Sequence, residues 1–424
     1  MNTETYFRAA RIAAVTPTLM LLCVPLVHAD AVTDWNGVMT DVIADEPNPA
    51  AGARTAVIAQ VAVFEAVNSI TGDYEPYRRR IEAPEGASAG AAAIAAAHAV
   101  LVRLHPDKAS QLNAQREKSL ATIPEGTGKV DGIAVGVAAA DELLALRARD
   151  GFDVEPTYTP GMQPGDYKPT PPDFTPAFMP GLGEVNTFVI RDGRQFRAPP
   201  PPDLRSKNYV RDFEEVKRVG EAHSAQRSGH HTEIARFYAA TDVDRIYYPA
   251  ARQVSAAQGR TLSENARLFA LLSMAIWDGI VACFETKYHF VLWRPVTAIQ
   301  EAQTDGNPRT QPDSKWEPLV FTPPFPTYPS GHASFGAAAR TILEDEFGAG
   351  GHDITLMNSA IPEVVLRYST FAQITDDIDE ARIFGGVHYR FDQEQGARLG
   401  RRVGEYVLRH ALRPACGQKH RPRQ

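Results

Sequence analysis

Cysteine is scarce in this chain of 424 residues, so a scaffold held together by several disulfides is excluded. Of the three cysteines, Cys23 lies in an N-terminal apolar segment, Cys283 in an apolar helical pattern and Cys416 in the C-terminal tail. A disulfide between Cys283 and Cys416 stays open as an alternative, although no framework spacing supports it. A chain of this length and composition can bury a sizeable hydrophobic core instead.

Long basic blocks are also missing, and the formal net charge is -7 at pH 7. This balance argues against nucleic acid and anionic membranes as partners. Beyond residue 29 no run reaches the ~18 uncharged apolar residues that a transmembrane helix requires. The mature chain is therefore predicted to be soluble, without a membrane span. Alternating strand patterns are rare and no repeat is apparent, which favours a mainly α protein.

The first 29 residues are typical of an export signal. Arg8 and Arg11 precede a mostly apolar run over residues 12–26, and a small-residue cleavage site ends at Ala29. We therefore expect a secreted or periplasmic protein, cleaved near Ala29. An uncleaved membrane anchor is the alternative, but Pro17 interrupts the apolar run, which is also short for a span.

Apolar residues three and four positions apart predict helices along most of the chain. The predicted helices cover residues 51–70, 88–104, 107–120, 130–149 and 263–286, the last of them apolar on nearly every side and therefore buried. The predicted domains are a signal peptide at 1–29, an N-terminal helical region at 30–150, a Pro-rich connecting segment at 151–230, a catalytic helical bundle at 231–415 and a basic tail at 416–424.

The Pro-rich segment cannot be a helix interior where its prolines concentrate. Twelve prolines lie between residues 152 and 202, and each removes a backbone donor. The tyrosines and phenylalanines among them argue against plain disorder, so we expect a long loop draped over the helices. Whether this loop forms part of a pocket rim or only a linker stays open.

The first motif places two cations, Lys287 and Arg294, seven residues apart in an apolar run. Seven residues at ~100° each return to nearly the same helix face, although Pro295 disfavours helical geometry at Arg294 and predicts a bend there. Buried cations need an anionic partner. A bound anion is one possibility, and ion pairs with Asp278 and Glu285 are the structural alternative.

The second motif is Pro-Ser-Gly-His at residues 329–332. Ser330 is a predicted helix N-cap, and the free N–H groups and positive dipole of a helix start suit an anion. Gly331 allows close approach of the backbone, and His332 in the first turn is placed for acid–base chemistry. A plain capped helix is the alternative.

The third motif runs from Arg382 through Gly385 and Gly386 to His388 and Asp392. If this segment is helical, Asp392 lies four residues from His388 on one face and can accept its ring N–H. The other ring nitrogen is then free to act as a ligand or a nucleophile. A core histidine satisfied by a carboxylate is the alternative.

Taken together, Lys-x6-Arg-Pro, Pro-Ser-Gly-His and Arg-x5-His-x3-Asp resemble the signature shared by vanadate haloperoxidases and type 2 phosphatidic acid phosphatases. The residues around the motifs are similar to the chloroperoxidase-like branch, and the likeness is clear from about Thr232 onward. The resemblance implies a mainly α helical bundle of the haloperoxidase/acid phosphatase type, with N-terminal helical hairpins packed on a C-terminal catalytic bundle.

The resemblance also implies a vanadate cofactor and the oxidation of halide by hydrogen peroxide to hypohalous acid. Carried over by motif, Lys287, Arg294 and Arg382 would neutralise the vanadate oxygens, Ser330 and Gly331 would donate hydrogen bonds, His388 would bind vanadium, His332 would assist proton transfer, and Asp392 would orient His388. Ala381 departs from the serine that the family often has there. Phe325 stands where chloride-oxidising members have Phe, which makes it a candidate for the halide pocket; a simple pocket wall is the alternative.

Two other functions fit the same residues. A secreted acid phosphatase would use His388 as a nucleophile that forms phosphohistidine, with His332 protonating the leaving oxygen. A non-catalytic protein would bind the oxyanion without turning it over. The oligomeric state is not predicted.

Overall fold

Helices dominate the computed structural model, which describes residues 30–241 and 244–415. The predicted mainly α fold is confirmed, since thirteen α-helices and one two-stranded sheet, with four short 3-10 turns, form the regular structure of these residues. The N-terminal helices are α1 (Ala31–Ile43), α2 (Pro49–Thr71), α3 (Ala89–Leu104), α4 (Ala109–Leu120) and α5 (Thr127–Arg147). The export signal with its cleavage site, the basic tail and Cys416 lie outside the described residues.

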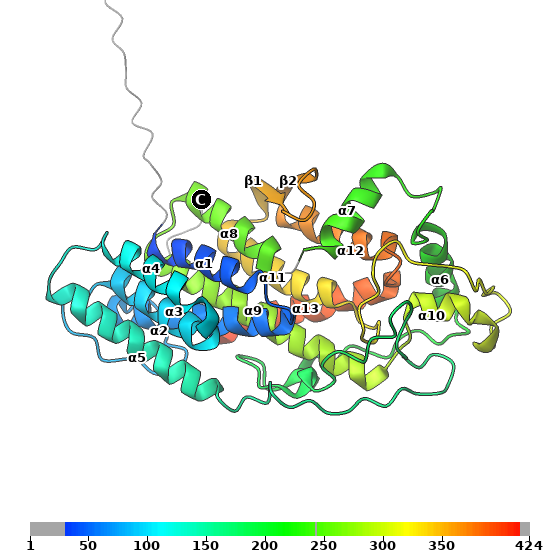
Figure 1. The fold of residues 1–424 in the computed structure, drawn as a ribbon, viewed down its shortest axis with the longest axis horizontal. Helices are drawn as coiled ribbons and strands as arrows, with labels where there is room; N and C mark the ends of the chain where they lie inside the picture. The colour runs from blue at the N-terminus through cyan, green and yellow to red at the C-terminus, as the bar shows by residue number, and fades with distance from the viewer. Residues whose placement is uncertain (1–29, 242–243, 416–424) are drawn as a thin grey trace, which may run out of the picture.

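The second half of the chain builds a longer helical bundle. Its elements are α6 (Lys207–Val219), α7 (Gly229–Ala239), α8 (Asp244–Gln258), α9 (Leu262–Phe290), α10 (Pro295–Gln300), α11 (Gly331–Phe347), β1 (Gly350–Met357), β2 (Val365–Thr370), α12 (Phe371–Phe384) and α13 (Arg390–His410). Figure 1 shows α2 to α5 at one end of an elongated molecule and α6, α10 and α12 at the other. The predicted domain bounds stay a prediction.

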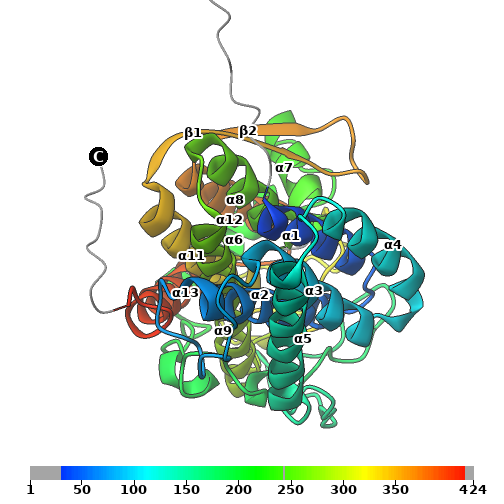
Figure 2. The same cartoon turned by 90° about the vertical axis from the view of Figure 1, so that its left-hand side faces the viewer.

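Helix α9 is the central element of the fold. A capping box between Thr261 and Glu264 starts it, and its residues from Leu268 to Ile276 are buried all round. It packs against α2 on one side and against α11 and α13 on the other. The contact between α2 and α9 joins the N-terminal hairpins to the bundle, and Figure 2 shows the two helices near the middle of the molecule.

By length and composition, α2 and α9 could each cross a membrane, so the expectation that no later stretch is long and apolar enough needs correction. The bent pair of α3 and the following segment to Leu120 passes the same test as one broken span. Within the most apolar window of α2, 89% of the residues are buried inside the protein, and for α9 the figure is 100%. Their apolar surfaces therefore face the core.

Several elements differ from the sequence prediction. Helix α1 and helix α6 were not predicted, and α6 lies inside the segment expected to be only a connector. The antiparallel hairpin of β1 and β2, where Ile354 pairs with Tyr368, adds a small sheet to a chain in which strands seemed rare. It lies across one edge of the bundle, as Figure 2 shows.

The Pro-rich loop is packed onto the bundle, as its aromatic residues predicted. We call residues 151–206 the strap; Figure 1 shows much of it along the lower edge of the molecule. The Tyr167 N–H donates to Val291 O at 2.6 Å, and the Phe178 N–H donates to Pro324 O at 2.7 Å. The first of these backbone hydrogen bonds holds the strap beside the end of α9, and the second beside the loop that precedes α11.

Candidate active site

Lys287 lies in the last turn of α9, with its side chain fully buried. The helix ends when Val291 adopts a left-handed conformation (φ 46°) and its N–H donates to Lys287 O. The Lys287 ammonium donates to Pro326 O at 2.8 Å and to Thr327 O at 2.9 Å. Burial lowers the pKa of Lys287 to about 7, because desolvation disfavours the charged form.

Arg294 lies on a bend, as Pro295 predicted, and not on the same helix as Lys287. It is the extended N-cap residue of α10 (φ -78°, ψ 155°). Its Nε donates to Phe325 O at 2.7 Å, and its Nη1 donates to Val387 O at 2.8 Å. Its Nη2 is buried and has no hydrogen-bond partner among the described residues. The bend therefore brings the guanidinium to the loop before α11 with donor capacity left over.

The predicted structural partners of these cations are engaged elsewhere. The Asp278 carboxylate accepts three backbone N–H groups of the strap, at residues 188–190, over 2.7–2.9 Å. Glu285 pairs with Arg197, also in the strap. The two carboxylates thus anchor the strap to α9 and leave Lys287 and Arg294 without an acidic partner from that helix.

Ser330 caps α11, which begins at Gly331, as predicted. Its hydroxyl accepts the Ala333 N–H at 3.4 Å, a long contact that leaves the hydroxyl able to serve another partner. His332 lies in the first turn, beside the Phe335 ring at a centroid distance of 5.0 Å, and makes no hydrogen bond with another described residue. Burial and then the charge of Arg382 hold the pKa of His332 well below its usual range.

Arg382 approaches the same place from the last turn of α12. It is 3% exposed, yet its Nε and Nη1 are buried without a partner in the described part of the chain. Burial, reinforced by the charge of Arg294, lowers the pKa of the Arg382 guanidinium to about 9. Such donors are costly to leave unpaired, so the arrangement is suited to an anionic ligand.

His388 and Asp392 meet as predicted, but not on one helix face. Helix α13 begins only at Arg390, so His388 belongs to the turn before it. Gly386 makes this turn with a φ of 80°, and a Cβ there would lie 2.4 Å from Gly220 O. His388 Nδ1 lies 2.8 Å from Asp392 Oδ2.

The protonation pattern of His388 follows from its neighbours. Arg294 Nη1 lies 3.2 Å from His388 Nε2, and because arginine can only donate, Nε2 is an acceptor and the ring proton is on Nδ1. The surrounding cations and burial hold the pKa of His388 well below its usual range, burial being the larger cause. A neutral imidazole with its lone pair on Nε2 is the form that a ligand or a nucleophile needs.

One residue of the site was not predicted. The Thr327 hydroxyl donates to Asp392 Oδ2 at 2.5 Å and lies 3.1 Å from His388 Nδ1. In the sequence it is a small residue between Pro326 and Tyr328, and only its position just ahead of the Pro-Ser-Gly-His motif points to the site.

Four residues of the second and third motifs and nine apolar residues line a cavity of about 120 Å³. Lys287, Arg294, Ser330 and Asp392 are not among the lining residues. Gly331, His332, Arg382 and His388 form the polar side. The apolar side is formed by Pro49, Ala50, Phe178, Leu182, Ile280, Phe284, Pro323, Phe325 and Phe335. Phe178 and Leu182 belong to the strap, so the strap does form part of the pocket wall.

Phe325 lies where the two sides meet. Its ring centroid is 5.0 Å from Lys287 Nζ and 4.8 Å from the Arg294 guanidinium carbon. The Phe284 ring packs against it at a centroid distance of 5.2 Å. Phe325 is therefore both a wall of the pocket and a cation–π partner of two site cations.

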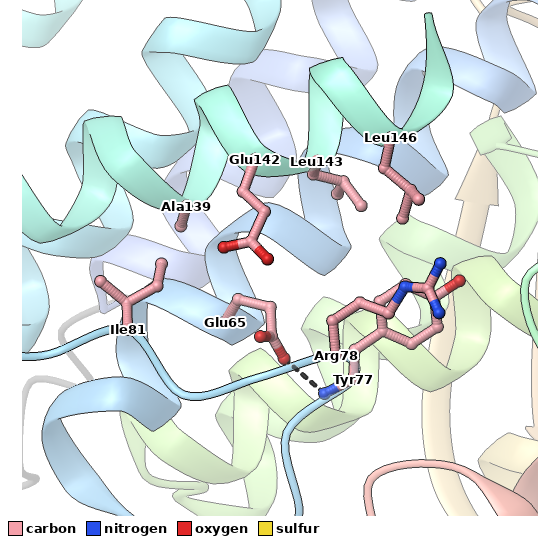
Figure 3. Close-up of a pocket in the computed structure, with 8 residues that line it drawn as sticks. All are labelled: Glu65, Tyr77, Arg78, Ile81, Ala139, Glu142, Leu143 and Leu146. Atoms are coloured by element: carbon pink, nitrogen blue, oxygen red, sulfur yellow. Dashed lines mark hydrogen bonds between the residues drawn. The ribbon is translucent and has the colours of Figure 1, made fainter. Parts of the chain in front are cut away.

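A second cavity, of about 370 Å³, lies apart from the site between α2, α5 and the segment after α2 (Figure 3). Figure 3 shows Glu65 of α2 and Glu142 of α5 on facing sides of it. Burial raises the pKa of Glu65 to about 7, and the Glu142 charge adds to this. No residue of the three motifs lines this cavity.

Comparison with known proteins places these residues in a family context. A family model described as the VCPO second helical-bundle domain matches residues 267–417, which include all three motifs. The vanadium chloroperoxidase of Curvularia inaequalis is 25% identical over 311 residues, or 57% of this chain and 51% of that protein. The chain thus spans about half the length of this curated relative.

Two solved structures share the fold at low sequence identity. A bacterial vanadium-dependent iodoperoxidase has a TM-score of 0.77 at 22% identity, covering 90% of this chain and 96% of that chain. An apo-type bacterial vanadium-dependent chloroperoxidase has a TM-score of 0.67 at 18% identity, covering 84% and 93%. The resemblance predicted from the three motifs is confirmed: the chain is similar to the vanadium haloperoxidases in sequence over its C-terminal bundle and in fold over most of its length.

Proposed function

We propose that this protein is a vanadate-dependent haloperoxidase that oxidises halide with hydrogen peroxide to hypohalous acid. The observation that carries the proposal is a set of buried cationic donors on Arg294 and Arg382 that have no acceptor among the described residues, next to a histidine whose Nε2 is an acceptor. A tetrahedral oxyanion satisfies such donors. The similar chloroperoxidase and iodoperoxidase are vanadium enzymes by name, which favours vanadate as that oxyanion.

In this proposal Lys287, Arg294 and Arg382 hold the vanadate oxygens, and Ser330 and the Gly331 amide at the start of α11 add hydrogen bonds. His388 would bind the vanadium through Nε2, while Asp392 accepts the hydrogen bond of the Nδ1–H group. Bound vanadate supplies a Lewis acid that activates peroxide. His332, neutral at physiological pH, accepts and returns a proton beside the anion.

We further propose that chloride is within the reach of this enzyme, and that Phe325 helps to form the halide pocket. The apolar side of the cavity excludes water, and the edges of aromatic rings carry a positive partial charge that suits a halide. A direct test compares oxidation of chloride, bromide and iodide by the vanadate-loaded protein. Oxidation of iodide alone would contradict the chloride proposal.

The signal-like pattern of residues 1–29 supports a proposal of secretion or export to the periplasm. Expression of the full chain followed by N-terminal sequencing of the exported protein tests it. The expected mature N-terminus lies near Asp30.

A phosphatase is the second candidate, because phosphate has the same shape and the same donor requirements as vanadate. His388 Nε2 would then attack phosphorus and His332 would protonate the leaving group. The deciding experiment measures two reactions on one sample: halogenation of a phenol dye with and without added orthovanadate, and hydrolysis of p-nitrophenyl phosphate. Halogenation that requires orthovanadate supports the haloperoxidase, whereas hydrolysis that orthovanadate only inhibits supports the phosphatase.

A protein that only binds the oxyanion is the third candidate. Replacing His332 with Ala removes the acid–base group without removing a cationic donor. We expect at least ~10²-fold lower turnover with orthovanadate affinity within a few-fold of the original. A wild-type protein that binds orthovanadate tightly and catalyses neither reaction would instead indicate the pure binder.

A further inference from the structure

Thr327 touches both halves of the pair that presents His388 to the pocket. It is fully buried, in the loop between α10 and α11. Its Oγ donates to Asp392 Oδ2 at 2.5 Å and lies 3.1 Å from His388 Nδ1. Because Nδ1 carries the ring proton, the Thr327 oxygen is a second acceptor for it beside Asp392.

The Asp392 carboxylate depends on this hydroxyl for its orientation. Its Oδ2 receives three hydrogen bonds, from His388 Nδ1, the Thr327 hydroxyl and the Tyr389 N–H at 3.0 Å. Its Oδ1 is buried and has no partner in residues 30–241 and 244–415. Only Oδ2 holds the carboxylate, so loss of one of its three donors frees the group to rotate toward an arrangement that satisfies both oxygens.

The backbone of Thr327 connects the same residue to the cationic side of the site. Its carbonyl accepts from Lys287 Nζ at 2.9 Å, and its N–H donates to Leu292 O at 3.0 Å. The main chain is thereby fixed from two directions, and the side chain is presented to His388 from a rigid support. Ser330 N–H in turn donates to Asp392 O at 3.0 Å, which ties the start of α11 to the same carboxylate residue.

We propose that Thr327 is a positioning residue: its hydroxyl holds Asp392 and the Nδ1–H of His388 so that His388 Nε2 faces the oxyanion. Thr327 is not among the residues that line the cavity, so it acts only through His388. This inference rests on the proposed function in one respect, the identity of the anion as vanadate. Partners that orient a ligating histidine from behind typically change metal affinity by about 10–100-fold when removed.

The test uses the full-length protein with three single substitutions. Thr327→Val keeps the shape and removes the hydroxyl, whereas Thr327→Ser keeps the hydroxyl. Thr322→Val is the matched control, because the Thr322 hydroxyl is buried in the same loop and has no hydrogen-bond partner among the described residues. Thr327→Ala is made as well, so that a variant without the hydroxyl is available if the valine protein folds poorly.

Two measurements follow the variants: orthovanadate affinity by calorimetry, and the nitrogen chemical shifts of His388 in protein free of anions, which report which ring nitrogen carries the proton. We expect Thr327→Val or Thr327→Ala to weaken orthovanadate binding about 10–100-fold and to populate the form with the proton on Nε2. Thr327→Ser and Thr322→Val should match the wild type in both measurements.

Wild-type affinity and unchanged His388 shifts in the hydroxyl-free variants would overturn the proposal. So would an equal loss in Thr327→Ser, because that outcome would assign the effect to packing of the methyl group. The shifts are read without vanadate or peroxide, and inorganic phosphate serves as a second binding probe. The role of Thr327 can therefore be decided even if the protein proves to be a phosphatase.

Discussion

Arg382 is the residue of the site whose charge is least compensated. Two of its three guanidinium nitrogens are buried without a partner in the part of the chain that the structure describes, and burial lowers its pKa to about 9. A charge held in this way costs stability in the absence of a ligand and contributes to affinity in its presence. The site thus trades folding stability for anion binding at this position.

We predict that Arg382→Met raises the melting temperature of anion-free protein while orthovanadate binding weakens by at least about 10²-fold, as for a lost charge-assisted pair. Scanning calorimetry and titration calorimetry measure the two effects. Arg390→Met is the control. Arg390 forms ion pairs with Glu215 and Glu380, so its replacement should lower the melting temperature of the protein. A lower melting temperature for Arg382→Met would contradict the prediction.

Glu65, in the second cavity (Figure 3), provides a prediction about pH. It is 8% exposed, and burial raises its pKa from 4.5 to about 7. The folded protein therefore binds this proton more tightly than the unfolded chain does, and the stability it contributes is present below pH 4.5 and lost as the pH rises through 7.

We predict that the Glu65→Gln protein does not lose this stability as the pH rises. Between pH 5 and pH 8, the wild type should lose up to about 3 kcal/mol of unfolding free energy relative to the variant, at ~1.4 kcal/mol per pH unit. Urea titrations at several pH values measure the difference. Glu142→Gln changes the more exposed carboxylate and should alter the pH dependence of stability less than Glu65→Gln does. Parallel pH profiles of the unfolding free energy for wild type and Glu65→Gln would refute the assignment of this dependence to Glu65.

At the residue scale, the sequence predicted the members of the site but not all of their connections. Lys287 and Arg294 were found because cations in apolar surroundings need an anionic partner, and Arg382 was found through its place in the third motif. Thr327 was missed because a single threonine in a loop carries no such signal, and its role exists only through contacts with residues far away in the chain.

At the scale of elements, the strap is the segment whose fit to the bundle determines the pocket. Phe178 is held at both of its backbone groups: its N–H donates to Pro324 O, and its carbonyl accepts the Tyr288 hydroxyl at 2.6 Å. Phe178 packs on Phe284 and Phe325, with ring centroids 6.3 Å and 6.2 Å away. Its position therefore sets the apolar wall opposite the anion.

We predict that Tyr288→Phe loosens this wall. Loss of one hydrogen bond of about 1–1.5 kcal/mol should speed amide exchange around residues 174–182 roughly tenfold. Hydrogen exchange with mass spectrometry measures the rate. Tyr158→Phe removes a comparable hydrogen bond, to Tyr167 O at 2.9 Å, and should leave the amides of residues 174–182 protected. Equal exchange rates in both variants would show that the Tyr288 hydroxyl does not specifically hold this segment.

Helices were predictable from the sequence where apolar residues recur at helical spacing over many turns. The predicted helices at 51–70 and 263–286 correspond to α2 and α9, and Ser88 caps α3 as expected. Strand β2 was missed because its alternation, with Leu366 and Tyr368 buried, spans only a few residues. The spacing of His388 and Asp392 resembles one helical turn, and the sequence left open whether the segment is helical. The structure starts α13 only at Arg390, and the tight turn at Gly386 produces the same contact.

At the scale of the whole molecule, anion binding and folding are linked. A ligand that binds only the folded chain stabilises it by about 2.7 kcal/mol at one hundred times its Kd. The anion-free pKa of Lys287 is about 7, and a bound anion raises it. Binding above pH 7 therefore takes up a proton, and affinity falls as the pH rises.

We predict that sulfate, a tetrahedral dianion that does not titrate in this range, raises the melting temperature more at pH 6 than at pH 8. Calorimetry in two buffers of different ionisation enthalpy counts the proton taken up. Lys287→Met should bind sulfate more weakly and with a flatter pH profile. A profile in the wild type as flat as in Lys287→Met would rule out Lys287 as the titrating group.

The apolar side of the pocket draws on both halves of the chain, and its polar side on the second half alone. Gly331, His332, Arg382 and His388 all lie in the second half, whereas four of the apolar residues, Pro49, Ala50, Phe178 and Leu182, lie in the first. Substitutions in the first half can therefore reshape the apolar wall while the residues proposed to bind the anion stay unchanged. The choice of reactant and the binding of the anion can thus be altered by separate substitutions.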